Sequence, residues 1–187
     1  MTINRRDFLK VSAGAAGAAA VGTLGGCATY YSGNYAPKIV VVGAGFGGST
    51  FARYTKAWYP KANITVIEPN DHFTSCPFSN TVLAGINKMQ DIEMPYTYIN
   101  KVVDAWVKDT VTAIDTGKQT VTTAGGKTFP YDRLVLAGGI ELLFDKVQGY
   151  DAEAQKTIKH AWKASADQTG VLREQLEAMP DGGTFVM

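Results

Sequence analysis

In this chain of 187 residues, three glycines and an acid at a characteristic spacing are the first candidates for a functional site. Gly43, Gly45 and Gly48 form a G-x-G-x-x-G pattern, and Glu68 lies 20 residues beyond Gly48. In such a loop the first glycine permits a tight turn, the second admits a pyrophosphate, and the third lets a helix pack on a strand. An acid at this distance accepts hydrogen bonds from a ribose 2′-OH and repels a 2′-phosphate. The pattern predicts a site for FAD or NAD rather than NADP.

A second candidate for a chemical role is Cys76, in the stretch FTSCPFSN. The other cysteine, Cys27, lies at the end of a predicted export signal. In an oxidising compartment Cys76 would have no partner in its own chain, and an unpaired thiol there is a liability unless it is used. His72 lies four residues earlier. Two interpretations of His72 stay open: it helps to form the Cys76 thiolate, or it is an ordinary loop histidine.

The export signal is predicted from Arg5 and Arg6, followed by Phe-Leu-Lys and a run of alanine and glycine. The run is too short and too rich in glycine for a membrane-spanning helix, and it resembles a twin-arginine signal. The sequence LGGC, ending at Cys27, resembles a lipobox. Cys27 is then either the lipidated first residue of the mature chain or an incidental cysteine in a discarded peptide. We expect a periplasmic protein, with a membrane contact only through such a lipid anchor.

The elements that must position these residues follow the order of an α/β fold. Residues 39–42 form a β-branched run typical of a buried strand, and a helix is expected from the glycine loop to about Tyr59. The stretch ANITVIEP predicts a second buried strand that ends at Glu68. Residues 101–131 predict an antiparallel meander with turns at 115–117 and 125–126. Residues 131–139, YDRLVLAGG, predict a further buried strand.

Composition narrows the class of partner. The net charge is +1, 45% of the residues are hydrophobic, and the lysines and arginines are scattered. These values are those of an ordinary globular domain and give no electrostatic argument for binding nucleic acid. No set of residues is predicted to bind a metal.

The order of strand, glycine loop, helix, meander and Y-D-x-L-V-L-A-x-G resembles the FAD domain of the two-dinucleotide-binding flavoproteins. The fold class implied is a Rossmann-like FAD-binding domain with an antiparallel β-meander insertion. The disulfide reductases of that superfamily carry two cysteines five positions apart, but the second position is Thr81 here. The cofactor-binding positions implied, besides Cys76, are Gly43, Ala44, Gly45, Gly48, Glu68, Pro69, Ala137 and Gly138.

Three stretches, IEPNDHFTSCPFSNTVLAG, AGGIELLFDKVQGYD and HAWKASADQTGVLREQLEAMPDGG, resemble the flavoprotein subunit of flavocytochrome c sulfide dehydrogenase. The resemblance runs from about Lys38 to the last residue. It implies a covalent bond between Cys76 and the flavin, sulfide as the substrate, and a haem c cytochrome subunit as the electron acceptor. In that family a redox-active disulfide next to the flavin reacts with hydrosulfide. No cysteine follows Cys76, so the catalytic disulfide is expected beyond residue 187. No chemical role is predicted for His160 and Trp162, in the stretch HAWK.

The predicted domains are a signal with a lipobox (1–27), a tether (28–37), the first part of the FAD-binding domain (38–150) and a crossover (151–187). Helical spacing of Val171, Leu172, Leu176 and Met179 precedes an apolar stretch that is expected to begin a strand of a second nucleotide-binding-like domain. On this interpretation the chain is the N-terminal part of a longer enzyme. The alternatives are a sulfide:quinone oxidoreductase, an NADH-type FAD oxidoreductase, or a non-catalytic truncated remnant.

Overall fold

The structure is a computed structural model that describes residues 35–162 and 164–184. The chain divides into two compact units, Met1–Pro37 and Lys38–Met187, and the second contains Gly43, Glu68 and Cys76. The predicted export signal and Cys27 lie outside the described residues. Within the described ranges, no helix combines the length and the apolar character needed to cross a membrane.

The central element is a parallel sheet of four strands in the order β5-β2-β1-β9. Its strands are β1 (Lys38–Val42), β2 (Asn63–Ile67), β5 (Ala105–Val107) and β9 (Arg133–Leu136). The register pairs Ile39 with Ile64 and Val40 with Leu134. Parallel strands end at the same edge of a sheet, so the loops after β1, β2 and β9 meet there. The predicted strands at these three places are confirmed, but the prediction that the last of them is buried was wrong: no residue of β9 is buried, and Leu136 is 66% exposed, because β9 lies at the edge of the sheet.

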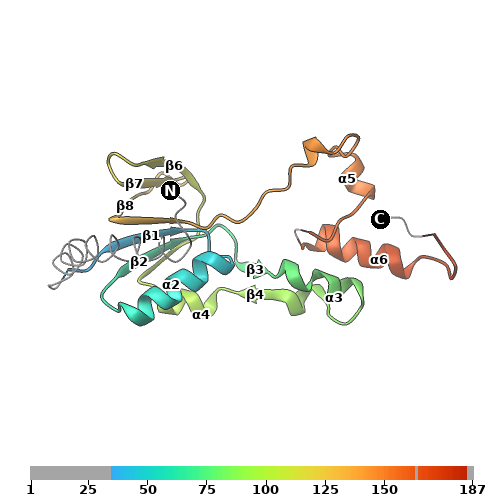
Figure 1. Cartoon of the computed structure of the whole chain (residues 1–187), viewed down its shortest axis with the longest axis horizontal. Helices are drawn as coiled ribbons and strands as arrows, with labels where there is room; N and C mark the ends of the chain where they lie inside the picture. The colour runs from blue at the N-terminus through green and yellow to red at the C-terminus, as the bar shows by residue number, and fades with distance from the viewer. Residues whose placement is uncertain (1–34, 163, 185–187) are drawn as a thin grey trace, which may run out of the picture. The chain divides into compact units, whose positions relative to one another are not determined.

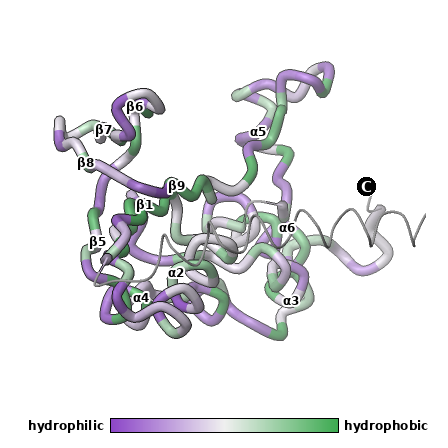
Figure 2. Tube along the Cα trace, turned by 60° about the vertical axis from the view of Figure 1, so that its left-hand side comes forward, coloured by the Kyte–Doolittle hydropathy of each residue, from purple (hydrophilic) through white to green (hydrophobic). Residues whose placement is uncertain are grey.

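Both faces of this sheet are covered, which explains why β1 is a continuous apolar run. Ile39 and Val41 face a core shared with α2 (Phe46–Trp58) and α4 (Thr97–Val102). Val40 faces the opposite core, which it shares with Val121 of the meander. Figure 1 shows the two helices on one face and the meander on the other. In Figure 2, β1 and β9 appear as hydrophobic stretches between these layers.

The meander consists of β6 (Val111–Asp115), β7 (Thr120–Thr123) and β8 (Thr128–Pro130), which pair in an antiparallel sheet. Both predicted turns are present. In the first, the Lys118 N–H donates to Asp115 Oδ1 at 2.8 Å, and in the second Gly126 has a φ of 76°.

The predicted start of the meander at residue 101 was wrong. Thr97–Val102 is a helix, and Ala105–Val107 belongs to the parallel sheet. The reason is Asp104, whose Oδ2 accepts a hydrogen bond from the Ile64 N–H at 2.8 Å and lies 2.7 Å from Lys56 Nζ. These contacts fix the start of β5 beside β2.

Between β2 and α4 the chain forms a hairpin around the segment that contains Cys76. A hairpin of β3 (His72–Thr74) and β4 (Glu93–Pro95) encloses short helices. These helices are η1 (Cys76–Phe78), α3 (Ser79–Leu83) and η2 (Met89–Ile92).

After β9 the described part of the chain forms four short helices: η3 (Phe144–Lys146), α5 (Ala154–Thr157), the π-helix η4 (Ala166–Gly170) and α6 (Val171–Glu177). The helix predicted from Val171 is confirmed, although Met179 lies beyond its end. Residues 180–184 contain no strand, and the rest of the predicted terminal strand lies outside the described residues.

Candidate functional site

Gly43, the first glycine of the loop, is required by the fold itself. Its φ is 89°, in the left-handed region that glycine tolerates best. A Cβ at this position would overlap the Ala137 carbonyl oxygen and lie 2.8 Å from the carbonyl carbon of the same residue. Gly43 therefore allows the loop after β1 to pass directly against the end of β9.

Gly48 is also required by packing. A Cβ there would overlap the Gly43 carbonyl oxygen and lie 3.3 Å from Val41 Cγ1. The first turn of α2 can approach β1 so closely only because Gly48 has no side chain, as the sequence predicts for the third glycine.

Gly45 differs from the other two, because nothing in the protein requires a glycine there. Its φ of −62° suits any residue, and a Cβ would make only an ordinary contact of 3.5 Å with the Phe73 ring. No described residue accepts a hydrogen bond from the N–H groups of Phe46 or Gly47 at the start of α2. Free N–H groups at a helix N-terminus favour a phosphate group. The loop thus leaves space and donors for a pyrophosphate, so these residues fit the dinucleotide part of FAD.

Glu68 lies at the end of β2 and is only 5% exposed. Its Oε2 accepts a hydrogen bond from the Ala44 N–H at 2.9 Å. Its Oε1 accepts from the N–H of Asn70 at 2.9 Å and from Asn70 Nδ2 at 2.6 Å. A carboxylate has about four acceptor positions, so one further hydrogen bond, such as one from a ribose hydroxyl, can be accepted.

Asn70 is a site residue that sequence reasoning missed. It follows Glu68 and the exposed Pro69, and its amide fixes the orientation of the carboxylate. An amide two residues after the strand-ending acid is the pattern that would have indicated it, because Asn side chains commonly bond nearby groups in turns.

Tyr96 adds a neutral neighbour to this acid. Burial of its hydroxyl, together with the negative charge of Glu68, raises the pKa of Tyr96 to about 12. The hydroxyl therefore remains protonated at neutral pH and places no second negative charge beside Glu68.

The end of β9 lies beside the glycine loop. The Ala137 N–H donates to the Val42 carbonyl at 2.8 Å, so pairing with β1 continues to Ala137. Gly138 is exposed, and a Cβ there would have no protein atom within 4 Å. The structure therefore brings Ala137 and Gly138 to the same edge as Gly43, and leaves open space above Gly138.

Cys76 is half-buried, and it is a free cysteine at the start of η1. Its Sγ lies 3.6 Å from the Trp162 carbonyl oxygen. Phe73, three residues earlier, packs on Phe46 at the start of α2, with ring centroids 4.7 Å apart. The β3 strand thus ties the Cys76 segment to the glycine loop.

The histidines have partners other than Cys76. His72 Nε2 lies 3.8 Å from Glu93 Oε1 across the hairpin, which favours the interpretation of His72 as a loop histidine. His160 packs against Phe144, with ring centroids 5.2 Å apart, and its Nδ1 is buried without a hydrogen bond. Burial of the ring lowers the pKa of His160.

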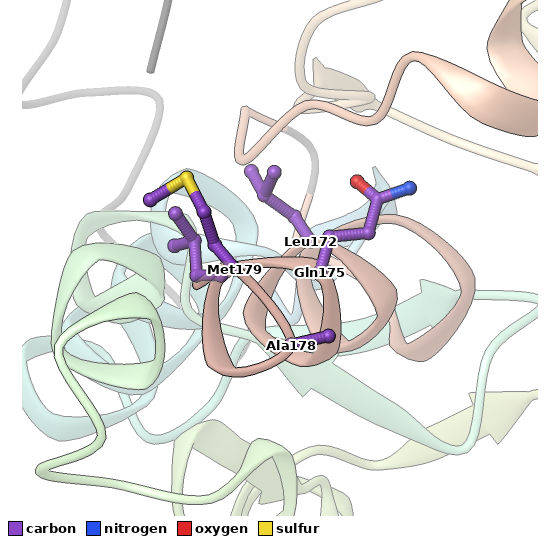
Figure 3. Close-up of a pocket in the computed structure, with 5 residues that line it drawn as sticks. Leu172, Gln175, Ala178 and Met179 are labelled. Carbon is purple, nitrogen blue, oxygen red and sulfur yellow. The ribbon is translucent and has the colours of Figure 1, made fainter. Parts of the chain in front are cut away.

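Two other features do not belong to this site. No group of three potential metal ligands occurs in residues 35–162 and 164–184. An apolar hollow is lined by α6 and the two residues that follow it, and Leu172, Gln175 and Met179 project to one side there (Figure 3). None of the predicted site residues lines it, and it has no titratable side chain.

Several known proteins are similar to this chain. The 45 residues that match the flavoprotein chain of flavocytochrome c sulfide dehydrogenase from Chlorobaculum thiosulfatiphilum are 47% identical, and they cover 24% of this chain and 94% of that one. The sulfide-quinone reductase of Aquifex aeolicus is 33% identical over 146 residues, covering 78% of this chain and 33% of that protein. The crystal structure of the sulfide:quinone oxidoreductase from Aquifex aeolicus has a TM-score of 0.63 at 27% identity, covering 76% of this chain and 32% of that one.

The chain spans only a quarter to a third of the sulfide:quinone oxidoreductases that it matches, from 25% for the protein of Dictyostelium discoideum to 33% for that of Aquifex aeolicus. Residues 2–22 match the twin-arginine translocation signal, which supports the predicted export route. Residues 37–177 match the pyridine nucleotide-disulphide oxidoreductase family, in agreement with the glycine loop and the parallel sheet. The chain therefore belongs to the pyridine nucleotide-disulphide oxidoreductase family.

Proposed function

We propose that this chain is the FAD-binding region of an exported oxidoreductase that takes electrons from sulfide and passes them to a haem c cytochrome subunit in the periplasm. The observation that carries the proposal is the space at Gly45, beside the free N–H groups of α2 and the buried Glu68. When bound there, FAD supplies an acceptor for the two electrons that leave the substrate.

The proposed roles divide among the strand ends. Gly45 leaves room for the pyrophosphate, with Gly43 and Gly48 shaping the loop and Ala44 within it. Glu68, held by Ala44 and Asn70, accepts a hydrogen bond from the adenosine ribose. Pro69, next to Glu68, is proposed to line the same part of the nucleotide site. Ala137 and Gly138 leave space where a side chain would obstruct the flavin.

Cys76 is the proposed point of covalent attachment. Its sulfur would replace one hydrogen of the flavin 8α methyl group, and that hydrogen and the thiol hydrogen would reduce the flavin itself. The attachment would retain the cofactor in a compartment that has no cytosolic supply of FAD. The tie from Phe73 to the glycine loop supports this role, because it fixes the Cys76 segment relative to the nucleotide site.

The proposed domain organisation is the one predicted from the sequence. It consists of a signal (1–27), a tether (28–37), the first part of the FAD-binding domain (38–150) and a crossover (151–187). Cys27 is proposed as a lipidation site. Within the second compact unit, the parallel sheet and the meander both precede residue 150, which supports this division.

A cytochrome acceptor is favoured by two observations, the 47% identity with a flavocytochrome c chain and the twin-arginine signal. A quinone acceptor is the second candidate. It is favoured by the longer match, over 78% of this chain, with a sulfide-quinone reductase.

The test uses the exported protein with its natural partners, purified from the cells that make it. Anaerobic addition of sulfide should reduce added cytochrome c, and decylubiquinone should be reduced far more slowly. Faster reduction of the quinone would favour the second candidate. If sulfide fails to reduce either acceptor while FAD is bound, the proposed substrate is wrong.

A further inference from the structure

Two parts of the chain, 86 residues apart in sequence, meet at Cys76. We call η1, α3 and η2 (residues 76–92) the Cys76 unit, and Trp162 with residues 164–177 the C-terminal clasp. The Trp162 carbonyl oxygen lies 3.6 Å from Cys76 Sγ, within reach of a thiol hydrogen bond. A backbone carbonyl can hold this position only if the clasp is fixed against the Cys76 unit.

An apolar contact contributes to that fixing. Val82 of α3, Ile92 of η2 and Ala164 of the clasp form one buried cluster, against which Met89 packs. This cluster is small: it contains three buried residues, and Ala164 lies in the loop before η4. Residues with so few apolar contacts open locally at a low cost in free energy, so a further tie is needed.

Arg173 of α6 supplies the polar tie. Its Nη1 donates to the carbonyl of Leu83, the last residue of α3, at 2.7 Å. Its Nε and Nη2 contact Glu177 Oε1 at 2.8 Å and 2.7 Å. A cation at a helix C-terminus satisfies carbonyl groups that have no partner within the helix.

Gly85 makes room for this guanidinium. It has a φ of 73°, and a Cβ there would lie 2.6 Å from Arg173 Nη2. An L side chain at position 85 would therefore displace the guanidinium from the carbonyl of Leu83.

We propose that Arg173 is a positioning residue for Cys76: by binding the Leu83 carbonyl, it closes the C-terminal clasp on the Cys76 unit and keeps the Trp162 carbonyl at the Cys76 sulfur. The consequence for covalent attachment rests on the proposed function. A sulfur held in one place meets the flavin methyl group more often in a reactive geometry than a mobile one.

The first test does not involve flavin. The full chain is produced under riboflavin limitation, and the rate of Cys76 alkylation by iodoacetamide is measured by peptide mass spectrometry. Arg173→Met should accelerate alkylation about tenfold, because release of the C-terminal clasp makes the half-buried Cys76 sulfur accessible to the reagent. Arg173→Lys should restore a rate near that of the wild type, because an ammonium group also donates to Leu83. Glu177→Gln should have little effect, because it leaves the Leu83 contact intact.

Two matched controls separate this effect from general loosening. Arg133→Met removes an exposed guanidinium that contacts the carbonyl of the neighbouring Asp132. Gly85→Ala and Gly126→Ala impose similar backbone strain, since the φ values are 73° and 76°, but only the Cβ at position 85 meets Arg173. Gly85→Ala should accelerate alkylation as Arg173→Met does. It therefore tests the proposal even if Arg173→Met does not fold. The two controls, Gly126→Ala and Arg133→Met, should not accelerate alkylation.

Unchanged alkylation in Arg173→Met and Gly85→Ala would overturn the proposal, as would equal acceleration in the controls. In a second arm, added FAD should form its covalent bond about tenfold more slowly in Arg173→Met, with unchanged non-covalent FAD affinity. If the wild type forms no covalent flavin, the role of Arg173 in attachment and the proposed function of Cys76 both fall, whereas the alkylation arm still decides the existence of the clasp.

Discussion

Glu68 at the end of β2 accepts a hydrogen bond of 2.9 Å from the N–H of Ala44, in the loop after β1. The acid predicted to contact a ribose is therefore also a structural part of the glycine loop. Its other oxygen accepts two hydrogen bonds from Asn70, so one buried carboxylate connects the two loops that form the nucleotide site.

Replacing Glu68 with Gln should weaken both the loop and the site. An amide has only one acceptor oxygen, so it cannot serve Ala44 and Asn70 together. We expect the free energy of unfolding to fall by about 1–3 kcal/mol and FAD affinity to fall at least about tenfold. Chemical denaturation and fluorescence titration with FAD measure these effects. Glu93→Gln, at a half-buried acid in the hairpin, is the control and should change FAD affinity little.

The three glycines should respond differently to added methyl groups. Gly48→Ala should destabilise the fold by about 2 kcal/mol or more, because the Cβ overlaps the Gly43 carbonyl. Gly45→Ala should change stability by less than about 1 kcal/mol but reduce FAD affinity, and Gly45→Val should abolish binding. Gly117→Ala is the control, since its Cβ would also make only an ordinary contact, 3.5 Å from Asp115 Oδ1. Undiminished flavin binding in Gly45→Val would show that no pyrophosphate lies at this loop.

Covalent attachment is checked by replacing each cysteine. In the complete protein, Cys76→Ser should retain some FAD that denaturant then releases, because the glycine loop holds the nucleotide without a covalent bond. In the wild type the flavin should remain with the polypeptide after acid precipitation and add its mass to the Cys76 peptide. Cys27→Ser should leave this attachment intact. Complete release of flavin from the denatured wild type would require another explanation for Cys76.

Asp104 should make stability depend on acid pH. Partial burial acts to raise its pKa, but hydrogen bonds from Lys56 and the Ile64 N–H outweigh this effect, and the pKa is lowered. A carboxyl whose pKa is lower in the folded state contributes stability above the unfolded pKa, and loses it as the pH falls through the folded value. We therefore expect the contribution of Asp104 to be lost progressively below about pH 4.

Denaturation curves of the wild type and Asp104→Asn at several pH values measure this contribution. Asp104→Asn should be less stable than the wild type at pH 7, and the difference should shrink with acidification. The control Asp71→Asn removes an exposed pair with Lys108, which should change stability little. A difference between wild type and Asp104→Asn that does not vary with pH would contradict the assignment.

Export is tested in the cell. Replacing Arg5 and Arg6 together with Lys should leave the protein in the cytoplasm, because the twin-arginine pathway recognises the arginine pair. Cell fractionation with immunodetection measures the distribution, and Lys10→Arg serves as a control that keeps the pair. Normal export of the double variant would show that another route is used.

The sequence by itself determined the local features of the nucleotide site. The β-branched run before Gly43, the spacing to Glu68 and the strand before Ala137 all depend on residues close together in the chain, whose patterns indicate strand, turn and helix directly. The same local patterns gave both turns of the meander and the helix that begins at Val171.

Only the tertiary structure decided the features that depend on distant residues. Whether residues 105–107 extend the meander or the parallel sheet depends on Asp104 meeting Ile64, 40 residues away. The contacts of Cys76 with Trp162 and of Leu83 with Arg173 join segments 86 and 90 residues apart. A short apolar strand suits either sheet equally well, and its choice of partner is made by side-chain contacts that no local pattern records.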